Sequence, residues 1–245
     1  MRVATIFAFL HTVISSMLFL ILLAIIFIPL LICLLVPEKY RFDNPVLYWI
    51  GSFFYWASLK IMLVPIKIKG ECGIPYDPAI IIANHESALD IPLLGALMHG
   101  HPHIWLATNH LFRLPLFSFF LPRATVVVDI ESPTKGMRSL LKAINLVKNR
   151  QTHIVLFPEG GRYQDEFVHD FYNGFVLLAK RTGKPVIPVR LFNAGKVYPV
   201  HSNLMGWHTV TVVIGKPFIY QVEETDEQFK QRVVQWFVDQ KEEQA

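Results

Sequence analysis

Several residue patterns are missing from this 245-residue chain, and each absence narrows the possible functions. Only 2 cysteines are present, Cys33 in a long apolar run and Cys72 in a glycine-flanked turn, which disfavours a disulfide and fits a reducing compartment. Runs of five or more Lys or Arg residues are absent, so we expect no nucleic-acid partner. The Gly-x-Ser-x-Gly motif is also absent, which argues against a serine-dependent lipase or thioesterase.

Charge is absent from residues 3–37, where the apolar sequence is interrupted only by Thr5, His11, Thr12, Ser15 and Ser16. A helix of this length would extend about 50 Å at roughly 1.5 Å per residue, beyond the ~30 Å hydrocarbon core of a bilayer. A cleaved signal peptide is the alternative, but its apolar region is only ~7–15 residues long and precedes small residues. We therefore expect a membrane segment.

A second apolar stretch, residues 45–66, carries a single charge, Lys60. It is rich in aromatic residues, namely Tyr48, Trp49, Phe53, Phe54, Tyr55 and Trp56. Tyrosine and tryptophan gather at the headgroup region because their rings have an apolar body and a polar edge. We expect residues 1–66 to form a two-helix membrane hairpin with a polar turn at 37–44, which enters or rests in the bilayer. Alternatively, residues 45–66 form a buried helix of the soluble domain.

Beyond residue 66, short β-branched runs alternate with helical patterns. We expect strands at 79–83, 103–107, 124–130, 153–157, 186–192 and 208–214, and helices at 88–98, 133–149 and 172–181. Thr225 and Gln228 have the spacing of a capping box, so we expect a final helix from residue 225. This alternation predicts an α/β domain over residues 67–245, with a mixed central sheet flanked by helices.

A histidine and an aspartate, His85 and Asp90, follow the expected strand at 79–83. This position places them at the edge of the sheet where α/β proteins bind ligands. A carboxylate that accepts a hydrogen bond from one imidazole nitrogen fixes the tautomer and leaves the other nitrogen as a general base. The pair therefore predicts acid–base chemistry; the alternative is a structural histidine that caps a turn.

Residues 157–162, Phe-Pro-Glu-Gly-Gly-Arg, come at the end of the expected strand at 153–157. Gly160 and Gly161 allow the backbone to approach a ligand closely. The planar guanidinium of Arg162 matches a phosphate group through two parallel hydrogen bonds. One interpretation is a phosphate-binding loop, and the other is a Gly-Gly turn with a surface arginine.

The two motifs together resemble those of the glycerolipid acyltransferase family, whose best-known members are the 1-acyl-glycerol-3-phosphate acyltransferases. In that family a His-x4-Asp motif precedes a Phe-Pro-Glu-Gly-Thr-Arg motif and a Val-Ile-Pro-Val-like strand, and this chain keeps the order, with Val-Ile-Pro-Val at 186–189. The resemblance implies a membrane-bound enzyme on the cytoplasmic face, in a bacterial inner membrane rather than an organelle. It implies acyl-CoA or acyl-carrier protein as co-substrate and no cofactor.

The resemblance also implies roles for the motif residues. His85 would deprotonate the free hydroxyl of lysophosphatidic acid, which attacks the acyl thioester, and Asp90 would orient His85. Glu159 and Arg162 would bind the glycerol phosphate. Gly160 and Gly161 would allow its approach.

Departures from the family pattern leave the acceptor open. Gly161 replaces the usual threonine, and Tyr172 stands where a lysine is common. The middle region, residues 108–130, lacks the usual Lys and Glu and the arginine after Asp129. Another lysophospholipid or a non-phosphate acceptor is therefore an alternative, as are a non-catalytic lipid-binding protein and an acyl-thioester hydrolase. The alternating histidines at 99, 101 and 103 suggest a metal site, but a helix-to-strand turn is favoured there because Gly and Pro separate them.

Overall fold

The computed structural model describes residues 3–42, 44–71, 73–75, 77–108, 125–128, 132–148, 150–165 and 167–242. The strands are β1 (Ile66–Gly70), β2 (Ile80–Ala83), β3 (His103–Thr108), β4 (Thr125–Val128), β5 (His153–Leu156), β6 (Val186–Phe192) and β7 (Val210–Ile214). The helices are α1 (Val3–Leu35), α2 (Glu38–Arg41), α3 (Pro45–Met62), α4 (Asp90–Leu97), α6 (Pro133–Val147), α7 (Gly174–Thr182), α8 (Ala194–Val197) and α9 (Asp226–Asp239).

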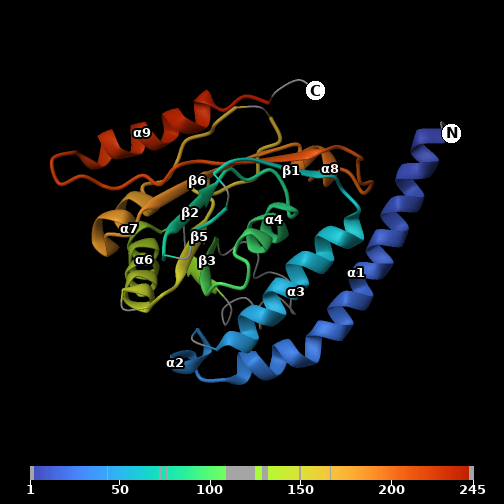
Figure 1. The fold of residues 1–245 in the computed structure, drawn as a ribbon, viewed down its shortest axis with the longest axis horizontal. Coiled ribbons are helices and arrows are strands. Elements are labelled where there is room, and N and C mark those ends of the chain that lie inside the picture. The colour runs from blue at the N-terminus through green and yellow to red at the C-terminus, as the bar shows by residue number, and fades with distance from the viewer. Residues whose placement is uncertain are drawn as a thin grey trace.

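The strands form one sheet in the order β1-β7-β6-β2-β5-β3-β4. Strand pairs are parallel except β6 with β7, which is antiparallel, so the predicted mixed sheet is confirmed. Figure 1 shows helices on both sides of this sheet. Successive residues of a strand point to opposite faces, and in β2 all of them are buried, as expected for a central strand.

Each face of the sheet has its own apolar core. On one face Ile80, Ile82 and Ile154 pack with residues of α6, α7 and α9. On the other face Ile81 and Val155 pack with residues of α4, and with partly buried residues of α3. Helix α3 therefore contributes to the core of the α/β domain.

Helices α1 and α3 pack together at the N-terminus, as predicted for a hairpin, and the turn between them contains the short α2. Residues Thr5–Cys33 of α1 are the one stretch of the described chain that is long and apolar enough to cross a membrane. Helix α3 buries part of its surface but leaves Trp49, Phe53 and Trp56 exposed. Both interpretations of residues 45–66 thus hold in part, because α3 belongs to the hairpin and also covers the sheet.

The expected strands and helices are present, most with ends shifted by a few residues, and the capping box of Thr225 and Gln228 is confirmed. Residues 124, 129 and 130 of the strand expected at 124–130 lie outside the described residues. Strand β1 was not predicted, because its Ile-Lys-Ile-Lys sequence directly follows the apolar stretch at 45–66. It pairs with β7 at the edge of the sheet.

Candidate active site

Strands β2 and β5 bring the two sequence motifs together. They are parallel neighbours, with Ile80 beside Ile154 and Ile82 beside Leu156, so their carboxyl ends lie at the same edge. His85 follows β2, and Glu159 follows β5. The two motifs therefore meet at this edge of the sheet, where the His85 backbone N–H donates to Glu159 Oε2 at 2.9 Å.

Asp90 is the first residue of α4 and is fully buried. Its Oδ2 accepts three hydrogen bonds, from His85 Nδ1 at 2.6 Å, Glu86 N at 2.7 Å and Ser87 N at 2.8 Å. The helix N-terminus adds a further favourable field for the carboxylate. The loop therefore folds around this one oxygen, and the predicted His85–Asp90 contact is present.

The contacts of His85 define its tautomer. Because Nδ1 donates to Asp90, the proton is on Nδ1, and Nε2 carries a lone pair. Arg162 Nε donates to that Nε2 at 3.2 Å. The Phe157 ring stacks on the imidazole with centroids 3.9 Å apart and planes 11° apart. The imidazole is thus held on one edge and one face, and Nε2 points toward an exposed arginine.

Glu159 has contacts that differ from its predicted role in acceptor binding. Its side chain is buried, with Oε2 accepting from His85 N and Oε1 from His169 N at 3.4 Å. Burial raises the pKa of Glu159, and these two backbone hydrogen bonds oppose that rise. The geometry favours a positioning role, in which Glu159 holds the backbone of His85.

The two glycines of the second motif differ in what they require. Gly160 has φ +67°, and a Cβ there would lie 2.6 Å from the Tyr172 ring. A Cβ at Gly161 would meet the end of the Tyr163 side chain at 3.1 Å, and that side chain can move. Gly160 is therefore required by the turn itself, whereas a Cβ at position 161 requires only a small shift of the Tyr163 side chain.

Two further residues of the loop between β2 and α4, Asn84 and Glu86, were not singled out from the sequence. The Asn84 side chain pairs with both backbone groups of Leu191, at 2.7 and 2.9 Å, and continues the pairing of β2 with β6. Glu86 Oε2 accepts from Gly195 N at 2.9 Å, and burial raises the pKa of Glu86 to about 7. The position of Asn84, a polar residue directly after a buried strand, could have indicated a role in this site. No feature of the sequence indicated the contact of Glu86 with Gly195.

The alternating histidines have structural partners. His99 and Gly100 have positive φ values of 46° and 84°, as expected for the predicted helix-to-strand turn. His103 is buried, its Nδ1 donates to His101 O at 2.8 Å, and burial lowers its pKa to about 4. In the described part of the chain no group of three or more His, Cys, Asp or Glu residues is arranged for a metal ion. Residues 109–124 and 129–131 of the middle region lie outside the described residues.

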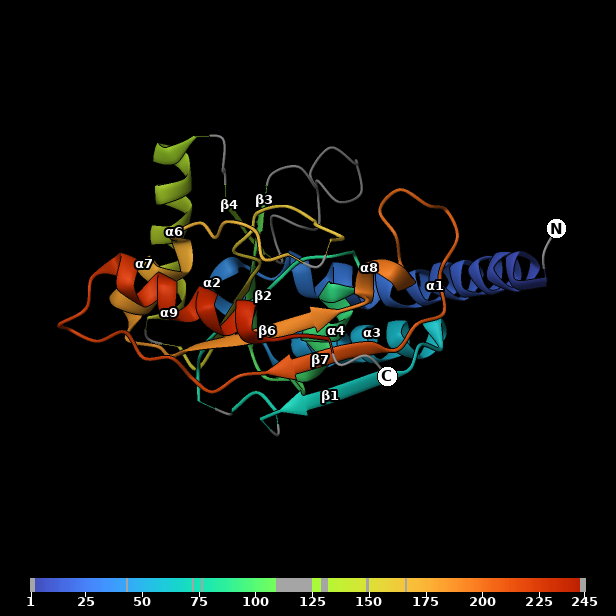
Figure 2. The same cartoon turned by 90° about the horizontal axis from the view of Figure 1, so that it is seen from above.

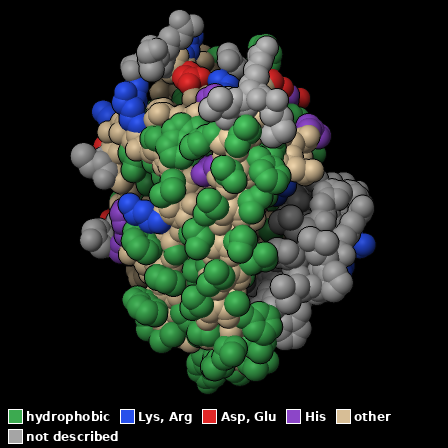
Figure 3. Space-filling view, turned by 90° about the vertical axis from the view of Figure 1, so that its right-hand side faces the viewer, with side chains coloured by type: hydrophobic (Ala, Val, Ile, Leu, Met, Phe, Trp, Pro, Cys, Tyr) green, Lys and Arg blue, Asp and Glu red, His purple; other side chains and the backbone are tan. Residues whose placement is uncertain are grey.

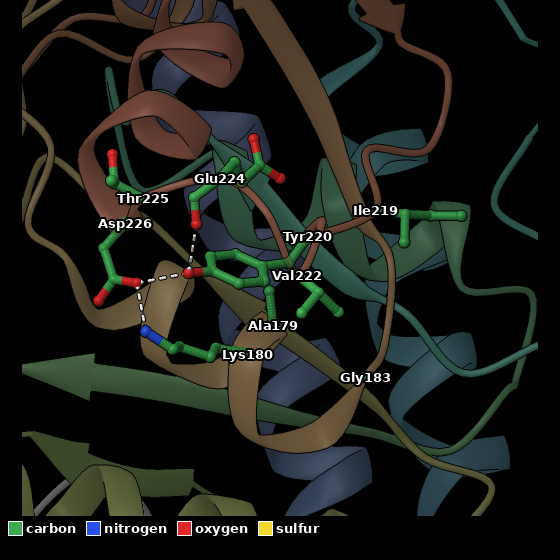
Figure 4. A pocket seen from close by; sticks show the side chains of 9 residues that line it. All are labelled: Ala179, Lys180, Gly183, Ile219, Tyr220, Val222, Glu224, Thr225 and Asp226. Carbon is green, nitrogen blue, oxygen red and sulfur yellow. Dashed lines mark hydrogen bonds and ion pairs between the residues drawn. The ribbon is translucent and has the colours of Figure 1, made fainter.

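A separate hollow lies away from the two motifs, between the end of α7 and the start of α9 (Figure 4). Its polar side chains bond one another: Lys180 pairs with Asp226 at 2.6 Å, and Tyr220 donates to Asp226 at 2.7 Å. These contacts support α9, and none involves a motif residue.

The motifs and the fold agree with known proteins. The model of the Acyltransferase family matches residues 51–191. The chloroplastic 1-acyl-sn-glycerol-3-phosphate acyltransferase BAT2 of Brassica napus is 30% identical over 66% of this chain and 48% of its own. The 1-acyl-sn-glycerol-3-phosphate acyltransferase of Pseudomonas aeruginosa is 25% identical over 74% of this chain and 69% of its own.

The first of these relatives is matched over about half of its length. The crystal structure of the 1-acyl-sn-glycerophosphate acyltransferase PlsC from Thermotoga maritima has a TM-score of 0.69 at 21% identity and covers 98% of this chain and 100% of its own, so the two share a fold. Because the family model spans more than half of the chain and includes both motifs that meet at this site, the chain belongs to the Acyltransferase family.

Proposed function

We propose that this protein transfers a fatty acyl group from an acyl thioester to the free hydroxyl of lysophosphatidic acid, giving phosphatidic acid. The observation that carries the proposal is the contact of His85 Nδ1 with Asp90 at 2.6 Å, which leaves Nε2 as an acceptor facing Arg162. The names of its relatives in plants and bacteria support the same acceptor. The donor is acyl-CoA or acyl-carrier protein.

In the proposed mechanism His85 Nε2 removes the proton of the acceptor hydroxyl as the oxygen attacks the thioester carbonyl. The imidazolium that forms donates from Nδ1 to the Asp90 carboxylate, which stabilises its charge. The tetrahedral oxyanion then collapses, the carbon–sulfur bond breaks, and the thiolate takes the proton from His85. The acceptor hydroxyl attacks the thioester directly, so the mechanism needs one general base and no nucleophilic side chain, and no acyl-enzyme forms.

Arg162 is the proposed phosphate ligand. Its guanidinium is exposed and lies 3.2 Å from His85 Nε2, so it stands where an acceptor hydroxyl must come. Binding of a phosphate would draw the guanidinium from Nε2 and free the lone pair, because a charge-assisted bond to phosphate is stronger than one to a neutral imidazole. One acceptor molecule would thus contact both side chains, with its phosphate bound by Arg162 and its hydroxyl bound by His85 Nε2.

The N-terminal helices support a membrane location. Most of α1 is exposed and apolar, and Figure 3 shows hydrophobic side chains gathered in a band on the face where α1 lies. We propose that the hairpin of residues 1–66 holds the α/β domain of residues 67–245 at the cytoplasmic face, where acyl thioesters are made. A lysophospholipid would then reach the site from the bilayer.

The test is thiol release from acyl-CoA by the purified protein in detergent, with and without lysophosphatidic acid. We expect release to require the acceptor, to vanish in His85→Ala, and to show a raised acceptor KM in Arg162→Ala. Release that is independent of any acceptor would indicate a hydrolase. Tight lysolipid binding without turnover, for acyl-CoA and acyl-carrier protein alike, would indicate a lipid-binding protein.

A further inference from the structure

The loop between α8 and β7, residues 198–209, lies against the N-terminal half of α1. Met205 N donates to Thr12 Oγ1 at 2.9 Å. The Trp207 ring meets Phe7 and His11 edge to face, with centroids 5.9 and 5.5 Å apart. Figure 2 shows this loop running beside α1. The loop therefore widens the surface that α1 presents.

The shape of the loop is fixed from within. Gly206 N donates to Val197 O at 2.9 Å, and a Cβ at Gly206 would clash with the carbonyl of Lys196. Met205 is buried, whereas Trp207 remains 48% exposed beside Phe7, which is 54% exposed. The loop thus buries one apolar side chain and holds the next large one outward, adjacent to the apolar face of α1.

The exposed side chains of this loop have the chemistry of a membrane interface. Tyr198, Val200 and Trp207 are exposed, and Tyr and Trp are the residues enriched at the headgroup level. Residues 195–222 contain no Asp or Glu; His201 and His208 lie in the loop, and Lys196 before it pairs with Glu242 at 3.7 Å. An anionic lipid surface therefore does not repel this segment.

The same segment is connected to the catalytic loop. Gly195 in α8 donates its N–H to Glu86, the residue after His85, at 2.9 Å. Gln164 Nε2 donates to the carbonyls of both Gly195 and Glu86, at 3.2 and 3.3 Å. A change in the position of α8 and its loop would therefore act on the backbone beside the catalytic histidine.

We propose that the loop of residues 198–209, through the exposed ring of Trp207, inserts into the headgroup region of the bilayer that holds α1. It thereby fixes the catalytic edge of the sheet at the lipid surface. The inference rests on the proposed function, because the bilayer that the loop would contact is also the source of the lipid acceptor. Its partner is a lipid bilayer, and continuity with the apolar face of α1 is what identifies that partner.

The first test measures tryptophan fluorescence of the full chain in vesicles with and without brominated acyl chains. The quenched intensity is the fluorescence that is lost when the acyl chains are brominated. We expect Trp207→Phe, which keeps an aromatic ring beside Phe7 and His11, to reduce this quenched intensity. Trp236→Phe is the control, because Trp236 lies in α9 and packs on the core of the α/β domain. An unchanged quenched intensity in Trp207→Phe would overturn the proposal and leave Trp207 as a packing contact to α1.

The second test compares Trp207→Asp with Val222→Asp, since Val222 is 92% exposed in the loop before α9. We expect Trp207→Asp to raise the KM for vesicle-borne lysophosphatidic acid about fivefold, as a charge at the lipid surface does. The KM for a short-chain, monomeric acceptor should not change, and Val222→Asp should change neither. Equal effects on both acceptors would contradict interfacial binding. A parent protein that acylates no acceptor would refute the proposed function, while the quenching result would still decide the loop.

Discussion

Asp90 contacts the loop between β2 and α4 through one carboxylate oxygen only. Oδ2 takes the three hydrogen bonds, and Oδ1 is buried with no hydrogen-bond partner in the described part of the chain. An asparagine can therefore keep its amide oxygen toward the three donors and place its NH2 group where Oδ1 lies. The substitution would remove the charge and leave the contacts, which separates electrostatic stabilisation of the imidazolium from loop geometry.

We expect Asp90→Asn to lower kcat by about 100-fold or more, in the range of general acid–base effects, with little change in the acceptor KM. The expected fall in kcat arises because the imidazolium of His85 loses its counter-charge. Steady-state kinetics with saturating acyl-CoA measure it, with Asp239→Asn, a substitution at the exposed end of α9, as control. A kcat near that of the parent would mean that Asp90 acts only on the structure of the loop.

Gly160 and Gly161 make a matched pair for stability. Gly160→Ala places a Cβ against the Tyr172 ring at a φ of +67°, and such a strained position costs on the order of 1–3 kcal/mol. Gly161→Ala meets only the movable end of Tyr163. We expect the thermal midpoint of Gly160→Ala to fall clearly and that of Gly161→Ala to stay within about one degree of the parent, because the Tyr163 side chain can move aside and no positive φ is strained there. Equal midpoints would contradict the steric argument.

At the scale of elements, Glu159 connects the loops that follow β2 and β5. Glu159→Gln replaces one acceptor oxygen by an NH2 group that faces a backbone N–H, so it should displace His85 without removing a charge from the acceptor site. We expect kcat to fall about tenfold, as small misplacements of catalytic groups do, with the acceptor KM nearly unchanged. Arg162→Ala should chiefly raise the acceptor KM. If Glu159→Gln instead raises that KM at constant kcat, Glu159 binds the acceptor as the family resemblance implied.

Glu86 joins the β2–α4 loop to α8, and its titration predicts a pH dependence of stability. Burial raises its pKa from 4.5 to about 7 in the fold, with the Asp90 carboxylate adding to the rise and Gly195 N and Arg190 opposing it. The fold thus disfavours the charged form. The contribution of Glu86 to stability is full below about pH 4.5 and is lost as the pH rises through about 7.

We expect Glu86→Gln, which keeps an acceptor oxygen for Gly195 N, to lack this loss. The difference in thermal midpoint, variant minus parent, should therefore increase between pH 5 and pH 7.5. The comparison with the parent removes the opposite contributions of His103 and His153, whose burial lowers their pKa values to about 4. A difference that is constant with pH would show that Glu86 does not titrate in this range.

The meeting of the two motifs was predictable, because both follow buried strands and parallel strands end at one edge. The contacts that complete the site were not. Glu86 meets Gly195, which is 109 residues away, and Asn84 meets Leu191, which is 107 residues away. Those pairings depend on β6 lying beside β2, and the order of strands is set by packing of the whole sheet. Strand β1 was missed because alternating Ile and Lys directly after an apolar helix gave no separate boundary.

At the scale of the whole molecule, α3 joins the N-terminal hairpin to the α/β domain. The Tyr55 ring packs directly on the backbone of Gly95 in α4, where a Cβ would clash with it. The Tyr55 hydroxyl accepts from Trp105 Nε1 at 3.0 Å and lies 3.3 Å from His103 Nε2. The Trp105 ring stacks on Phe157, which itself stacks on His85. The hairpin is therefore in contact with the site through a short series of partly buried aromatic residues.

This contact predicts that the hairpin and the domain of residues 67–245 unfold as one cooperative unit in detergent. Gly95→Ala should lower the single thermal midpoint, because overpacking a fixed ring costs typically ~1–3 kcal/mol. Gly51→Ala, in α3, is the matched control: its Cβ would lie 3.7 Å from the same Tyr55 ring, and alanine favours the helix, so its midpoint should match or exceed that of the parent. Scanning calorimetry with both variants measures this. Two separate transitions, with Gly95→Ala shifting neither, would mean that the hairpin is an independent domain whose contact with α4 contributes little stability.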